Sequence, residues 1–174
     1  MIFLNNKIIL FALFLLLFLF SCSVEPEISD AGEVSIEEII ESYNYYGFKV
    51  YYNEYEPHQE YADSIKMLFK PETHKYILYT SPSCFSCGQT DSLLPYACKV
   101  IRNIGLNDSC FYLFDTPKVS SGHPFDTIIN LERLPSAYVK KADEIYSLLD
   151  TLRVRRNQSD DYIPIEQIML ELIK

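Results

Sequence analysis

The chain opens with an apolar stretch from Ile8 to Phe20 that holds no charged residue and no helix breaker, and Lys7 lies directly before it. A short basic end followed by such a stretch is typical of a signal peptide. The stretch is shorter than the roughly 20 residues with which a helix crosses a bilayer. The pattern therefore predicts that residues 1–21 form a signal peptide that is removed on export.

Further along, apolar residues recur at helical spacing in some segments and form short uninterrupted runs in others. Ser35 and Glu38 have the spacing of a capping box, which marks the start of a helix. The periodicity predicts helices at about 35–46, 59–69, 84–104, 126–131 and 165–173, and strands at 48–52, 76–79, 111–114, 136–139 and 144–149. One domain over residues 35–174 follows, with residues 35–46 as an N-terminal helical extension.

The runs Tyr76–Tyr79 and Phe111–Phe114 lack polar alternation, as strands buried on both faces of a sheet do. The long helix between them completes a βαβ unit, whose strands are parallel and whose crossover is right-handed. Gly105 is placed to end that helix in the left-handed conformation, and Pro95 is expected to kink it. After a loop, two strands joined by a tight turn at Lys140–Asp143 predict an antiparallel hairpin.

The charge of the chain limits its partners. The net charge is −9 and the isoelectric point is near 4.8. Such a surface repels the phosphates of nucleic acids and anionic lipid headgroups. We therefore expect no nucleic-acid partner.

The end of the apolar stretch resembles a bacterial lipobox, with Leu19 three residues before Cys22 and the small Ser21 directly before it. The resemblance implies cleavage before Cys22 and acylation of its sulfur, and more than one acyl chain is enough for stable anchoring. The alternative is an ordinary signal peptide with an incidental cysteine. Residues 22–34 are acidic with few apolar groups and predict a flexible tether. Ser23 after Cys22 resembles lipoproteins of the outer membrane, so we expect a bacterial cell-envelope protein.

Four cysteines remain after Cys22, and the compartment of an exported protein does not keep thiols reduced. Cys84 and Cys87 form a C-x-x-C between a predicted strand and the start of a long helix. Free backbone N–H groups and the helix dipole stabilise a thiolate there, and the thiolate is the form that attacks a disulfide. The second sulfur, one helical turn further on, can resolve the mixed disulfide. The spacing therefore predicts a redox-active pair.

Residues 46–174 resemble the thioredoxin superfamily, with the C-x-x-C after a central strand, then a helix, a strand, a helix and a final hairpin. Leu134-Pro135-Ser136 looks like the cis-Pro loop of that family, and cis peptide bonds are nearly confined to X-Pro. The resemblance implies an α/β fold, a three-layer α/β/α sandwich with a mixed central sheet. It also implies that Cys84 is the nucleophile, that Cys87 is the resolving thiol, and that Leu134 and Pro135 bind substrate. We therefore expect a membrane-anchored thiol–disulfide oxidoreductase that acts on protein thiols or disulfides without a cofactor.

Several positions depart from the family pattern. Ser83 precedes the first cysteine, where thioredoxins usually have an aromatic residue, and the chain has no Trp. Leu78 takes the place of a buried Asp that accepts a proton, and Phe85-Ser86 between the cysteines leaves the redox direction open. The alternative is a redox-inactive thioredoxin-fold lipoprotein that serves as a binding or scaffold module.

The other cysteines and the histidines allow further interpretations. Cys98 and Cys110 lie across a short turn, so they form a structural disulfide or remain as two unpaired cysteines in apolar surroundings. A zinc site needs four ligands, but the chain lacks a second C-x-x-C, and its three histidines (His58, His74 and His123) have no partner at i+3 or i+4. We therefore expect no metal.

Two last interpretations concern His123 and the tyrosines. A Cys–His hydrolase would pair Cys84 with His123, but Cys87 could trap such a nucleophile as a disulfide, so this interpretation ranks low. The tyrosine-rich segment could form a carbohydrate or peptide platform, although aromatic faces more often pack a core. Packing is therefore favoured for Tyr43, Tyr45, Tyr46, Tyr51, Tyr52, Tyr55 and Tyr61.

Overall fold

The computed structural model describes residues 30–82, 92–159 and 162–174, which form a mixed α/β fold around a five-stranded sheet. The strand order is β1-β3-β2-β4-β5. β2 and β3 are parallel, and the other neighbouring pairs are antiparallel. The strands are β1 (Gly32–Glu33), β2 (His74–Thr80), β3 (Phe111–Asp115), β4 (Ser136–Lys141) and β5 (Glu144–Ser147).

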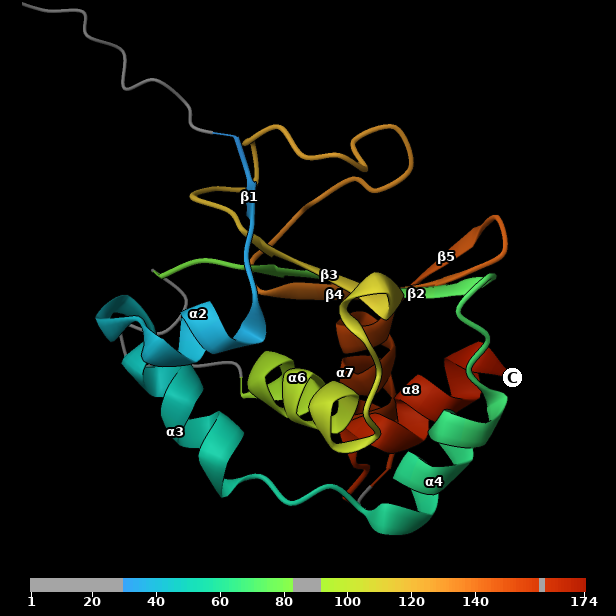
Figure 1. The fold of residues 1–174 in the computed structure, drawn as a ribbon. Coiled ribbons are helices and arrows are strands. Elements are labelled where there is room, and N and C mark those ends of the chain that lie inside the picture. The colour runs from blue at the N-terminus through green and yellow to red at the C-terminus, as the bar shows by residue number, and fades with distance from the viewer. Residues whose placement is uncertain (1–29, 83–91, 160–161) are drawn as a thin grey trace, which may run out of the picture.

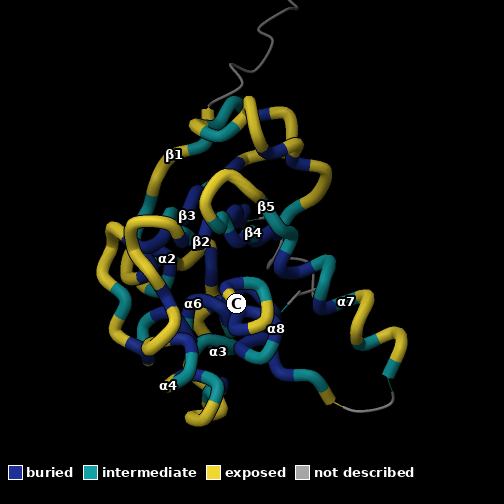
Figure 2. Tube along the Cα trace, turned by 90° about the vertical axis from the view of Figure 1, so that its right-hand side faces the viewer, coloured by how far each residue is buried: buried dark blue, intermediate teal, exposed yellow. Residues whose placement is uncertain are grey.

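The helices gather on one face of this sheet, as Figure 1 shows. They are α2 (Ile36–Glu41), α3 (Tyr46–Glu54), α4 (Gln59–Leu68), α6 (Leu93–Asn103), α7 (Leu148–Gln158) and α8 (Ile165–Ile173), with short 3-10 turns η1 (Tyr43–Tyr45) and η2 (Asp108–Cys110). Within the described ranges, no helix is long and apolar enough to cross a membrane. In Figure 2 the central strands are buried, whereas the second half of α7 is exposed.

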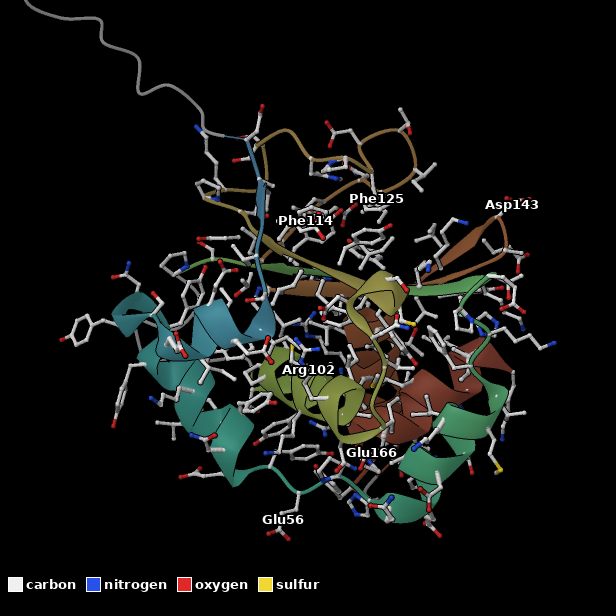
Figure 3. All side chains as sticks on the ribbon, in the orientation of Figure 1. Glu56, Arg102, Phe114, Phe125, Asp143 and Glu166 are labelled. Carbon is white, nitrogen blue, oxygen red and sulfur yellow. The ribbon has the colours of Figure 1, made fainter. Side chains whose placement is uncertain are left out.

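Alternate residues of β2 supply two separate cores, because successive side chains of a strand point to opposite faces. Tyr76 and Leu78 belong to the core shared with the helices, and Ile77 and Tyr79 belong to a smaller core on the other face. Residues 116–135 cover that second face, where the ring centroids of Phe114 and Phe125 are 6.0 Å apart (Figure 3). The expected three-layer sandwich is therefore not seen in the described residues, since this segment lies where a second layer of helices would be.

The predicted helix at 126–131 is wrong. Residues 124–128 form a turn instead, in which the backbone N–H groups of Ile128 and Ile129 both donate to the carbonyl of Phe125, at 2.9 and 2.8 Å. Ile129 then packs into the small core, together with Leu131. The apolar residues that suggested a helix serve to hold this segment on the sheet.

The predicted strand at 48–52 is also wrong, because these residues lie in α3. Phe48 and Tyr52 are spaced by four residues, which brings them together on one side of a helix, and their rings stack at 6.3 Å. Phe48 is fully buried. Packing of this aromatic pair outweighs the strand preference of aromatic and β-branched residues.

Other predictions around the sheet are confirmed. The capping box of Ser35 and Glu38 begins α2, and Gly105 follows α6 with φ of 72°. The βαβ unit and the hairpin β4–β5 form as expected, and α8 follows Pro164.

The expected kink at Pro95 has no basis in the structure. Pro95 is in the first turn of α6, where its missing N–H removes no hydrogen bond of the helix interior.

Two elements were not predicted. α7 begins after Ser147, whose side chain accepts a hydrogen bond from the N–H of Asp150, so the predicted last strand ends earlier. β1 lies within the segment predicted as a tether, and pairs Gly32 with Asp115 of β3. The N–H of Val34 donates to the carbonyl of Leu113 at 2.9 Å and extends this pairing. The ordered domain therefore starts before residue 35.

Candidate functional site

The C-x-x-C motif lies outside the described residues, as do Cys22 and the signal sequence. In the chain, Cys84 and Cys87 stand between Pro82, which follows β2, and Ser92, which precedes α6. The surroundings that the structure does describe are the carboxyl ends of β2 and β3 and the start of β4. In open α/β sheets, ligands bind outside the carboxyl ends of the parallel strands.

Buried hydroxyl groups lie at the carboxyl ends of the parallel strands. Thr80 pairs with Asp115 across the ladder, and the N–H of Thr116 donates to the carbonyl of Thr80 at 2.8 Å. Both threonines are fully buried, and their hydroxyls have no hydrogen-bond partner among the described residues. Ser121, 3 % exposed, likewise has a hydroxyl without a partner in the described ranges. This sheet edge therefore holds buried polar groups that residues 30–82, 92–159 and 162–174 do not satisfy.

Leu134 and Pro135 lie beside this edge. The peptide bond between them is cis, as the cis-Pro resemblance implies. Ser136, the first residue of β4, pairs with Tyr79 near the end of β2, and its hydroxyl donates to the carbonyl of Arg133 at 2.7 Å. The structure thus brings the predicted substrate loop next to the strand from which the chain runs to Cys84.

His123 lies on the face of the sheet that residues 116–135 cover, and both of its ring nitrogens lie within hydrogen-bond distance of a partner. The hydroxyl of Tyr79 lies 3.0 Å from Nδ1, and Asp126 Oδ1 lies 3.0 Å from Nε2. The His123 side chain is 4 % exposed. Tyr79, His123 and Asp126 thus form a hydrogen-bonded chain that ties residues 116–135 to the sheet, and both ring nitrogens of His123 have a partner among the described residues.

The tyrosine-rich segment divides between packing and exposure. Tyr45 is buried, and its hydroxyl donates to Asp115 Oδ1 at 2.7 Å, which fixes η1 near the carboxyl end of β3. Tyr55 is buried and stacks on Tyr96 at 4.0 Å. Tyr43 and Tyr46 are exposed. Packing is therefore the role of part of the segment only.

Cys98 and Cys110 are both free and buried, so the disulfide between them is not formed in the structure. Cys110 Sγ lies 3.1 Å from Asn107 Oδ1. Burial raises the pKa of the Cys98 thiol well above its ordinary value, because a thiolate would lose its hydration. Both are structural thiols of the core shared with the helices.

Cys98 is expected to resist alkylation in the folded protein. The thiolate attacks the alkylating reagent and displaces iodide, and burial both disfavours the thiolate and shields the sulfur from the reagent. Peptide mass spectrometry after iodoacetamide at pH 8 should find Cys98 unmodified without denaturant and modified in urea. Labelling of Cys98 in the native protein at the rate of an exposed thiol would contradict its burial.

A buried acid that the sequence did not reveal lies in α8. Glu166 is fully buried, and its Oε2 accepts from the hydroxyl of Tyr55 at 2.5 Å (Figure 3). Its Oε1 accepts from the backbone N–H of His58 at 2.6 Å and lies 2.8 Å from His58 Nδ1. Glu166 therefore fixes the connection between α3 and α4 onto α8. The only signal in the sequence is an acid beside the apolar stripe of that helix.

No group of three potential metal ligands occurs among the residues that the structure places. Comparison with known proteins finds no family model, no curated protein and no solved structure that matches the chain.

Proposed function

We propose that the protein is a thioredoxin-like thiol–disulfide oxidoreductase that uses Cys84 and Cys87. The observation that carries the proposal is the place of the motif in the topology. The C-x-x-C joins β2, the central strand, to α6, and β3 returns parallel to β2. Pro135 precedes the antiparallel strand β4 at the same end of β2. This order supports the thioredoxin-like fold, although residues 116–135 replace a helical layer.

The reaction follows from the two thiols. The Cys84 thiolate attacks one sulfur of a substrate disulfide, which forms a mixed disulfide and releases one substrate thiolate. The Cys87 thiolate then attacks Cys84 Sγ, so the second substrate thiolate leaves and both take up protons. The substrate gains two electrons, and the protein keeps a Cys84–Cys87 disulfide. A partner dithiol restores the reduced pair, and the same steps in reverse oxidise a substrate dithiol.

The alternative is a redox-inactive scaffold of the same fold. Leu78 favours it, because this residue is fully buried among apolar side chains where thioredoxins keep a proton-accepting carboxylate. Without a nearby base, deprotonation of the second thiol is slower. The protein then serves to bind a partner at the membrane rather than to turn over.

We place the protein in the bacterial cell envelope, anchored through acylated Cys22. The net charge of −9 disfavours direct binding to anionic lipid, so attachment depends on the acyl chains.

Differential alkylation tests both parts of this proposal. The purified protein is labelled with one thiol reagent before and another after dithiothreitol, and peptides are read by mass spectrometry. The oxidoreductase predicts that Cys84 and Cys87 change label together and reversibly, and the lipoprotein predicts an N-terminal peptide that starts at acylated Cys22. If the label on Cys84 and Cys87 never changes, the redox-inactive scaffold is supported. If Cys22 is not acylated, the proposed lipid anchor is contradicted.

A further inference from the structure

A cavity of about 470 Å³ opens at the amino end of β2, away from the strand ends described above. Its lining includes three lysines (Lys70, Lys141 and Lys174) and His74. β2 has seven residues, so at about 3.3 Å per residue the cavity lies roughly 20 Å from the carboxyl end of the strand. Its lining comes from the end of α4, the start of β2, the β4–β5 turn and the end of α8. These segments lie together beside the C-terminus in Figure 1.

Backbone hydrogen bonds hold two of these lysines close to His74. Lys141 is the ladder partner of His74 in the β2–β4 pair. The N–H of His74 donates to the carbonyl of Lys70 at 2.7 Å, and the N–H of Ala142 donates to the carbonyl of Thr73 at 2.8 Å. The positions of both lysine backbones are therefore set by the sheet and by the turn before it.

His74 offers one hydrogen-bond donor. Its Nδ1 accepts from the backbone N–H of Lys70 at 3.0 Å, so the proton of the neutral ring is on Nε2. The residue is 4 % exposed, and its ring packs against Phe69 with centroids 5.5 Å apart. Packing and the Nδ1 bond thus fix the orientation of this donor.

Three lysines stand against one acidic residue, Glu72, in the lining of the cavity. Over the described ranges, no ion pair joins a carboxylate to any of the three lysines (Lys70, Lys141 and Lys174). Glu72 is the acid that lines the cavity with them. Burial lowers the pKa of His74, Lys141 and Lys70 lower it further, and Glu72 opposes them. This local excess of positive charge, in a chain of net charge −9, favours an anionic ligand over a cationic one.

We propose that this cavity binds a phosphate group through Lys70, Lys141 and the Nε2–H of His74. Lysine ammonium groups act as point charges toward phosphate, and several of them around one tetrahedral dianion share its oxygens. The proposal does not depend on the redox proposal, since it uses other residues at the other end of β2.

Titration with inorganic phosphate at constant ionic strength tests the site. The resonances of the His74 ring are expected to shift in a saturable way, and its pKa is expected to rise because the bound dianion offsets the neighbouring lysines. Lys141→Gln and Lys70→Gln should each weaken phosphate binding about tenfold, which corresponds to the loss of one charge-assisted hydrogen bond. Lys118→Gln, the same charge change on an exposed lysine in the 116–135 segment, should leave it unchanged.

Two outcomes would overturn the proposal, and a second probe identifies the source of the phosphate. Equal responses to phosphate, acetate and chloride would reduce the effect to screening, and loss of binding in Lys118→Gln would make it a general charge effect. Either result overturns the site. Vesicles that contain a phosphomonoester lipid serve as a second probe. Binding of vesicles that needs Lys70 and Lys141 identifies the phosphate as a lipid headgroup, whereas binding of inorganic phosphate alone identifies a free ligand.

Discussion

Cys84→Ser is expected to abolish reduction of a protein disulfide, because it removes the attacking sulfur. Cys87→Ser is expected to keep the first attack and to stop before resolution, so a mixed disulfide between Cys84 and the substrate accumulates. Turnover with insulin as substrate, followed by non-reducing electrophoresis, measures both effects. We expect activity at the background of dithiothreitol in each variant and a substrate adduct in Cys87→Ser alone.

Cys110→Ser is the matched control for this pair. Cys110 is a buried free cysteine, so its replacement should leave the specific activity of the folded protein unchanged. Adducts in Cys84→Ser rather than in Cys87→Ser would reverse the roles of the two thiols. Activity that survives in both variants would contradict the proposed function.

Glu166→Ala is expected to lower the free energy of unfolding by about 3 kcal/mol. The change leaves the hydroxyl of Tyr55 and the N–H of His58 without their acceptor, and each buried donor left unsatisfied costs about 1–3 kcal/mol. Urea unfolding followed by far-UV circular dichroism measures the loss, which suits a chain without Trp.

Glu171→Ala is the control on the same helix. Glu171 pairs with Arg155 at the exposed surface, and such pairs contribute less than about 1 kcal/mol. We expect the two variants to differ clearly in their unfolding midpoints. Equal midpoints would mean that Glu166 does not fix the α3–α4 connection.

The sequence predicted correctly those elements that depend on a few neighbouring residues. The capping box of Ser35, the left-handed Gly105 and the unbroken run around Tyr76 each identified an element that the structure has. In each case a backbone requirement or continuous burial determines the residue type, so neighbouring residues are enough to reveal it. The cis peptide bond between Leu134 and Pro135 was predicted in the same way, whereas the role of the C-x-x-C stays a prediction.

The sequence predictions that failed concern segments whose structure depends on contacts with residues distant in the sequence. By residue type alone, Phe48 and Tyr52 favour a strand. In the structure they stack on one side of α3, which packs against η1 and α6. Ile129 and Leu131 have apolar spacing that suits a helix, yet they fill a core made mainly by strands. Glu166 could not be identified as buried, because its partners are more than 100 residues away in sequence. α7 was missed because its exposed half carries little apolar pattern.

If the protein is anchored through Cys22 as proposed, the pairing of β1 with β3 limits the distance between the sheet and the membrane. Gly32 is joined to Asp115 at the carboxyl end of β3, the same end of the sheet from which the chain runs to Cys84. Only residues 23–31 would then separate an acylated Cys22 from Gly32, a span of at most about 36 Å. Substrates would have to present their disulfides within that distance of the bilayer surface, so the anchor itself would select partners by their height above the membrane.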